Sequence, residues 1–258
     1  MSGVSGVTPR PERLAALRRV GHKGADLIAP GNTRESFDRA LEAGVDMIEF
    51  DVLRLRDGSL VLAHDWQDAA ERDCLTLAEG LDIFCSTAYA GVDLDVDLKL
   101  RDYEREVVEG LIERGLEERS LISTTYTESL SVIGKLAPEL RRGWSMPRAR
   151  RDYTRSVLAP GAYALLRVMR RRLPGKAAMA LRAGRCEALM VHWLLASPEL
   201  VDAVHGAEGQ VYVWTVDDPE RIALLDSQGV DGVITNDPRL FGSLRPSTDP
   251  PGGATIGA

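Results

Sequence analysis

The sequence has few cysteines, no long apolar run and no excess of positive charge, and each absence argues against a class of protein. Three cysteines, Cys74, Cys85 and Cys186, are an odd number without metal-ligand spacing, which argues against a disulfide framework and a zinc site. No run of roughly 18 apolar residues occurs, so no membrane-spanning helix is expected. Residues 1–20 lack the apolar core of a signal peptide, so we expect a cytoplasmic protein.

The net charge is negative but unevenly distributed. It is −7 for the whole chain, whereas a surface that binds nucleic acid needs an excess of Lys and Arg to neutralise phosphates. We therefore expect no nucleic-acid partner. Segment 148–185 differs from the rest, because it has eleven Lys or Arg residues against Asp152 alone, a local charge of +10 that leaves −17 elsewhere.

Short apolar runs alternate along the chain with segments of helical pattern, which is typical of a parallel sheet with crossover helices. Eight strands are expected, near residues 19–22, 47–53, 93–99, 121–125, 142–146, 188–193, 210–216 and 232–236, with a short extra strand at 60–63. Helices are expected at 33–43, 101–114, 127–136, 198–204 and 219–227, with Thr33, Ser197 and Asp217 as N-caps. Eight strand–helix units favour a closed barrel over an open doubly wound sheet. No G-x-G-x-x-G lies at a strand-to-helix turn, so a dinucleotide site is not expected.

The predicted domain organisation is one barrel with a tail at each end. A chain of 258 residues with 44% hydrophobic content can bury one large core, which we place at residues 19–242. Residues 1–18 are expected to form a tail and a capping helix from Pro11 to Arg18. The Pro- and Gly-rich segment 243–258 is expected to be disordered. Segment 148–185 is predicted to be a basic helical insert between the fifth and sixth barrel strands.

Charged residues alternate with apolar ones on two predicted strands. Glu49 and Asp51 are two residues apart, so they point to the same face. The stretch 92–100 (VDLDVDLKL) likewise sets its charged residues on one face: Asp93, Asp95, Asp97 and Lys99. A solvated edge strand is one explanation, but in a helix-covered parallel sheet such charges need partners. Glu49, Asp51 and Asp97 together would offer oxygen ligands to one hard divalent cation, Mg²⁺ or Ca²⁺.

Two histidines follow predicted strands near these acids. His22 comes directly after the first strand and His64 after the short extra strand. Either His alone is more often a core or surface residue. Beside a cation and carboxylates, however, two imidazoles can act as general acid and base. Asp65 is expected to orient His64 or its loop.

The motifs that hold these residues resemble the glycerophosphodiester phosphodiesterase family, whose signature is H-R-G, P-E-N-T, E-x-D-V, D-G and V-x-x-H-D. The corresponding stretches are His22-Lys23-Gly24, Pro30-Gly31-Asn32-Thr33, Glu49-Phe50-Asp51-Val52, Asp57-Gly58 and Leu62-Ala63-His64-Asp65. Residues 211–216 (VYVWTV) and 229–235 (GVDGVIT), followed by Asp237-Pro238, resemble the family's seventh and eighth strands. The resemblance covers about residues 19–240.

This resemblance implies a TIM (β/α)₈ barrel of the α/β class and the hydrolysis of a glycerophosphodiester to glycerol 3-phosphate and an alcohol. It further implies the following roles: a divalent cation on Glu49, Asp51 and Asp97, catalysis by His22 and His64, neutralisation of the phosphate by Lys23 and Lys99, and contact of Trp214 with the glycerol carbons. A buried barrel tryptophan is the alternative for Trp214. Which His is the acid stays open.

Three residues depart from the family pattern. Lys23 replaces the usual Arg, so that a bidentate contact with phosphate becomes a point charge. Gly31 replaces the Glu of P-E-N-T and removes a carboxylate near the cation. Asp97 replaces the more frequent Glu of E-x-K. These departures keep a second hypothesis open, a catalytically weak barrel that binds lipid.

The basic segment 148–185 suggests a further partner. An Arg-rich amphipathic stretch beside the barrel mouth can lie on anionic lipid headgroups. The protein would then be peripheral at the inner membrane face, and its substrate a lysophospholipid rather than a soluble glycerophosphodiester. The alternative is a helix packed on the barrel with solvated or paired arginines.

Overall fold

The computed structural model of the chain describes residues 16–147 and 159–244. Within these ranges, a nine-stranded sheet closes on itself because β1 (Arg18–Gly21) pairs with both β2 (Met47–Arg54) and β9 (Gly232–Thr235). Only β3 (Leu60–Val61) is antiparallel, against the end of β2. The other eight strands are parallel, so the predicted TIM (β/α)₈ barrel is confirmed.

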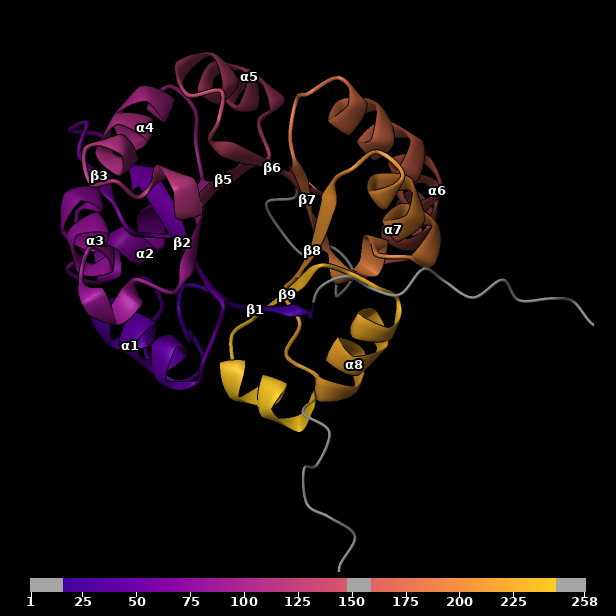
Figure 1. Cartoon of the computed structure of the whole chain (residues 1–258), viewed down its shortest axis with the longest axis horizontal. Helices are drawn as coiled ribbons and strands as arrows, with labels where there is room; N and C mark the ends of the chain where they lie inside the picture. Colours follow the sequence, from indigo (N-terminus) through magenta and orange to yellow (C-terminus); the bar gives the residue numbers. More distant parts are fainter. Residues whose placement is uncertain (1–15, 148–158, 245–258) are drawn as a thin grey trace, which may run out of the picture.

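Helices surround the barrel, as Figure 1 shows. The remaining strands are β4 (Asp93–Leu98), β5 (Ser120–Thr124), β6 (Arg141–Met146), β7 (Ala188–His192) and β8 (Gln210–Trp214). The α-helices are α1 (Arg34–Glu42), α2 (Trp66–Glu71), α3 (Leu77–Phe84), α4 (Glu104–Ile112), α5 (Thr127–Leu136), α6 (Ala159–Arg182), α7 (Pro198–His205) and α8 (Pro219–Ser227).

Several local predictions need correction. Helices α2 and α3 were not predicted from the sequence, although a capping box, in which Thr76 and Glu79 bond reciprocally, marks the start of α3. The N-cap of α8 is Asp218 rather than Asp217. The capping helix predicted from Pro11 to Arg18 is wrong at its C-terminal end, because residues 16–17 are not helical and Arg18 begins β1. The rest of this predicted helix lies outside the described ranges. A 3₁₀ helix continues to Leu244, two residues into the predicted tail.

The alternation on β2 separates the core from the site, as predicted. Ile48, Phe50 and Val52 are fully buried in the layer between sheet and helices. There Phe50 stacks on Phe84 of α3 with a ring-centroid distance of 5.2 Å. Burial of this apolar face fixes the register of β2, because a one-residue slip would move the aromatic ring inward and the carboxylates outward.

Strand β4 lies between β2 and β5, so the edge-strand explanation for its charges is wrong. Its apolar residues face the helices and its charged residues face the barrel interior. At the end of the barrel opposite the mouth, Asp93 forms ion pairs with Arg18 and Arg141. The charges at the other end of β4 take part in the site.

The described part of the basic segment is the crossover helix α6 between β6 and β7. Leu173, Ala177 and Leu181 are buried in the cluster that α6 shares with α7. The arginines at 167, 170, 171 and 172 are exposed, as the packed-helix alternative expects; residues 148–158 lie outside the described ranges. Among the helices described, none combines the length and apolar character needed to cross a bilayer.

Candidate active site

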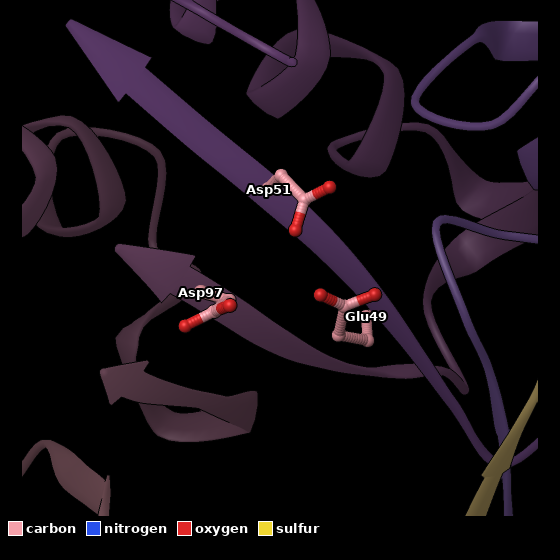
Figure 2. Close-up of side chains that lie close together, drawn as sticks. All are labelled: Glu49, Asp51 and Asp97. Carbon is pink, nitrogen blue, oxygen red and sulfur yellow. The ribbon is translucent and has the colours of Figure 1, made fainter. Parts of the chain in front are cut away.

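Three carboxylates meet at the mouth of the barrel. Glu49 and Asp51 extend from β2 toward Asp97 on the neighbouring strand β4, as Figure 2 shows. One oxygen of each carboxylate lies within 4.8 Å of an oxygen from the other two. Glu49 and Asp51 are buried and Asp97 is partly buried. Hard oxygen donors at this spacing fit a divalent cation such as Mg²⁺ or Ca²⁺.

The charge balance of this cluster also fits a cation. Lys99 Nζ lies 2.5 Å from Asp51 Oδ1 and 2.5 Å from Asp97 Oδ2. Burial alone would raise the pKa of Asp51, but positive charge, chiefly that of Lys99, outweighs it and lowers the pKa. Burial, reinforced by the charge of Asp51, raises the pKa of Glu49 well above its usual range. One ammonium group thus does not compensate three carboxylates.

Asn32 orients Asp51 and was not singled out from the sequence. Its side-chain amide donates to Asp51 Oδ2 at 2.9 Å, and its carbonyl oxygen accepts the backbone N–H of Asp51 at 3.0 Å. Asn32 is fully buried and has a positive φ of 58°, a conformation that Asn tolerates better than most residues. Its place in the Pro30–Thr33 motif was the available signal.

His22 is fixed by residues from the far end of the chain. Its Nδ1 lies 2.5 Å from Asn236 Oδ1, and its Nε2 lies 3.9 Å from Glu49 Oε2. The Asn236 amide nitrogen donates to Asp217 at 2.6 Å, so its oxygen faces the imidazole and places the proton on Nδ1. Burial lowers the pKa of His22, which leaves Nε2 free to accept a proton. Asn236 and its partner Asp217 were missed because Asn236 meets His22 only in the closed barrel.

His64 lies at the rim of the site, with about half of its side chain exposed. Its Nδ1 is 3.1 Å from Asp65 Oδ2. The other oxygen of Asp65 accepts the backbone N–H groups of Gln67 and Asp68, so Asp65 is the N-cap of α2. Asp65 therefore contacts both the imidazole and the loop, as expected.

A cavity of about 550 Å³ brings most of the predicted residues together. Its wall includes His22, Glu49, His64, Asp97, Lys99 and Trp214. Trp214 is only partly buried and lies edge-on to His192, with ring centroids 5.1 Å apart, so it is not the buried core residue of the alternative. Asp51 lies behind the wall, and Lys23 does not line the cavity either. Lys23 instead forms an ion pair with Asp26 at 2.9 Å.

Asp95 is a further carboxylate in this cavity, outside the trio. It pairs in register with Glu49, is 1% exposed and lines the cavity wall. Within the described residues its Oδ1 has no hydrogen-bond partner. Burial raises the pKa of Asp95 to about 8, so the folded protein holds a proton there that the unfolded chain releases near pH 4.

This raised pKa predicts how Asp95→Asn changes stability with pH. Between about pH 4 and pH 8 the folded state binds more protons than the unfolded state, so the contribution of Asp95 to stability falls as pH rises. Asn mimics the protonated acid. We expect the free energy of unfolding of the variant to match that of the wild type near pH 4. Relative to the wild type it should then rise by up to ~1.4 kcal/mol per pH unit toward pH 8. Urea unfolding of both proteins in EDTA measures this difference; a difference independent of pH would contradict it.

Comparison with known proteins agrees with the motifs. A family model described as "Glycerophosphoryl diester phosphodiesterase family" matches residues 22–75 and 92–240. A glycerophosphodiester phosphodiesterase of Caldanaerobacter subterraneus subsp. tengcongensis is 26% identical over an alignment 261 positions long. The alignment covers 87% of this chain and 96% of that protein.

Solved structures share the fold. A putative glycerophosphoryl diester phosphodiesterase of Silicibacter pomeroyi superimposes with a TM-score of 0.69 at 22% identity, over 90% of this chain and 95% of the other. A phosphodiesterase of Oleispira antarctica, solved in complex with the product sn-glycerol-3-phosphate, has a TM-score of 0.63 at 22% identity, over 88% and 96% of the two chains.

Proposed function

The chain belongs to the glycerophosphoryl diester phosphodiesterase family, and on that premise we propose that it hydrolyses glycerophosphodiesters to glycerol 3-phosphate and an alcohol with one divalent cation. The observation that carries the proposal is the carboxylate trio Glu49, Asp51 and Asp97, next to a cavity that His22 and His64 also line. The product held by the Oleispira antarctica phosphodiesterase supports the same substrate class.

The proposed roles follow from charge and position. Glu49, Asp51 and Asp97 hold the cation, which when bound polarises phosphate oxygens and lowers the pKa of a nearby hydroxyl or water. Lys99, on the cavity wall, and Lys23 neutralise the phosphate. Trp214 contacts the glycerol carbons from the opposite part of the wall.

The two histidines transfer protons on either side of the phosphorus. We assign His22 as the base, because its Nε2 lies 3.9 Å from Glu49 of the carboxylate cluster and its side chain is only 20% exposed. It accepts the proton of the nucleophile, which is a water or the glycerol 2-hydroxyl; in the second case a water must then open the cyclic phosphate to give glycerol 3-phosphate. His64 is at the solvent-exposed rim, where a variable alcohol must leave, so we assign it as the acid that protonates the departing alkoxide.

Removal of the cation tests the proposal directly. Protein dialysed against EDTA is expected to lose release of glycerol 3-phosphate from glycerophosphocholine and glycerophosphoethanolamine, and Mg²⁺ or Ca²⁺ should restore it. The reason is that an uncompensated carboxylate cluster repels the phosphate. An enzyme-coupled assay for glycerol 3-phosphate measures the effect. Full turnover in EDTA would contradict the role of the cation.

A second candidate is a lysophospholipase D that acts at an anionic membrane. The exposed arginines of α6 favour it. In that case, the protein binds anionic vesicles in a salt-sensitive manner, and the binding is lost when Arg170, Arg171 and Arg172 are replaced by Glu. Indifference to vesicles would end this candidate. The cytoplasmic location stays a prediction.

The catalytically weak lipid-binding barrel is the third candidate, motivated by Lys23 and Gly31. It predicts no turnover of any glycerophosphodiester or lysophospholipid with either cation. The assay described above therefore separates it from the proposed hydrolase.

A further inference from the structure

Asp26 links the two residues of the β1–α1 loop that depart from the family pattern. Its Oδ2 accepts a hydrogen bond from Lys23 Nζ at 2.9 Å, and its Oδ1 accepts the backbone N–H of Gly31 at 2.9 Å. Lys23 is the position of the usual Arg, and Gly31 is the position of the usual Glu. One carboxylate therefore contacts both departures at once.

The contact explains why residue 31 is a glycine. A Cβ atom at Gly31 would lie 2.4 Å from Asp26 Oδ1 and 2.8 Å from the Cβ of Lys23. These distances are far below van der Waals contact, so Asp26 and a side chain at position 31 exclude each other. Gly31 is not among the residues with positive φ, so the requirement for glycine is steric. It comes from the Asp26 carboxylate and from the Cβ of Lys23, the two residues that form the ion pair.

The main chain of Lys23 is already fixed. Its N–H donates to Glu49 Oε2 at 2.8 Å, and its carbonyl oxygen accepts the N–H of Asn32 at 3.0 Å. The long side chain is the remaining freedom, and Asp26 removes it. Lysine loses much rotamer entropy when it is ordered. A Lys23 side chain that is already ordered before the substrate binds therefore contacts a phosphate at a smaller entropic cost than a mobile side chain would.

We propose that Asp26 is a positioning residue: it holds the Lys23 ammonium group for the substrate phosphate and takes over the carboxylate that the family carries at position 31. The loop then keeps one positive and one negative charge, with the negative charge moved from residue 31 to residue 26. This inference rests on the proposed function, because the phosphate is that of the glycerophosphodiester.

Kinetics of Asp26→Asn test the positioning role. Asn keeps the acceptor for the Gly31 N–H and loses the charge that holds Lys23. We expect KM for glycerophosphocholine and Ki for inorganic phosphate to rise about three- to tenfold, with kcat nearly unchanged because ground state and transition state lose the same contact. Unchanged or lower KM and Ki would overturn the proposal. Glu42→Gln, which removes the exposed (i, i+3) pair with Arg39 on α1, is the matched control and should alter neither constant.

A double-mutant cycle tests the exchange of carboxylates. Gly31→Glu alone should lower Tm, because its side chain meets Asp26. Asp26→Ser alone should raise KM and Ki. The double variant should recover part of the lost Tm, since the Cβ of Lys23 still crowds position 31, and most of the phosphate affinity, so the effects are non-additive. Additive effects on Tm would overturn the steric link even if no diester were turned over. A wild type without turnover would contradict the proposed function, whereas an active wild type with an additive cycle would contradict this inference alone.

Discussion

Replacement of Asp51 by Asn is expected to lower kcat for glycerophosphodiester hydrolysis about 1,000-fold. Asp51 is fully buried, is oriented by Asn32 and pairs with Lys99, which also contacts Asp97. Asn keeps the shape and removes one negative charge from the proposed cation site. Charge stabilisation by a bound cation is worth several kcal/mol, and each ~1.4 kcal/mol is a factor of ten in rate.

The same variant should bind Mg²⁺ and Ca²⁺ at least about tenfold more weakly, measured by isothermal titration calorimetry in the absence of substrate. This readout separates loss of the cation from loss of chemistry. Asp46→Asn is the matched control, because Asp46 precedes the same strand at the opposite end of the barrel, where it pairs with Arg19. The control should keep both kcat and cation affinity. Asp51→Asn with unchanged cation affinity would contradict the assignment of Asp51 as a ligand.

Alternation along strands predicted the barrel and the faces of its central strands. On β4 every second residue is charged, and on β2 Glu49 and Asp51 share one face. For a buried parallel strand with two such different faces, one arrangement remains, with apolar residues toward the helices and charges inward. Glu49, Asp51 and Asp97 followed from that pattern, because residues on neighbouring parallel strands meet wherever the register brings them together. Their clustering is confirmed, whereas their roles stay predictions.

Residues that orient the site could not be predicted in the same way. Asn236 contacts His22 across nearly the whole length of the chain, and Asp217 in turn accepts a hydrogen bond from Asn236, so no local pattern relates them to His22. Asp217 looked like a helix N-cap because it is followed by Asp-Pro, but Asp218 takes that position. Adjacent acids compete for one cap, and only the three-dimensional structure shows which of them is free to bind elsewhere.

The basic segment illustrates a different limit. Its charge suggested an added element, yet the barrel needs a crossover helix between β6 and β7, and α6 is that helix. Apolar residues at 173, 177 and 181 are spaced for one buried helical face. The sequence predicted an amphipathic helix here and left open whether it packs on the barrel, because the total charge of a segment does not show which helical face is buried.

Replacement of His64 and of His22 by Gln should each lower kcat for glycerophosphocholine by about 100- to 10,000-fold, because each imidazole transfers a proton in the transition state. The two variants should differ in their response to the leaving group. Choline is a poor leaving alcohol that needs a proton, whereas p-nitrophenolate leaves without one. We therefore expect His64→Gln to recover most of its activity on glycerol 3-phosphate p-nitrophenyl ester, and His22→Gln to recover little.

The physical basis of this difference is the placement of the two rings. The His22 side chain is 20% exposed and its Nε2 lies 3.9 Å from Glu49, which places it to serve a nucleophile at the proposed cation site. The His64 side chain is half exposed at the rim, where we propose that the alcohol leaves. His205→Gln is the control, since His205 lies on the surface and pairs with Asp231 away from the cavity; its activity should match the wild type on both substrates. Recovery of His22→Gln in place of His64→Gln would reverse the assignment of acid and base, and recovery of neither would mean that protonation of the leaving group does not limit the rate.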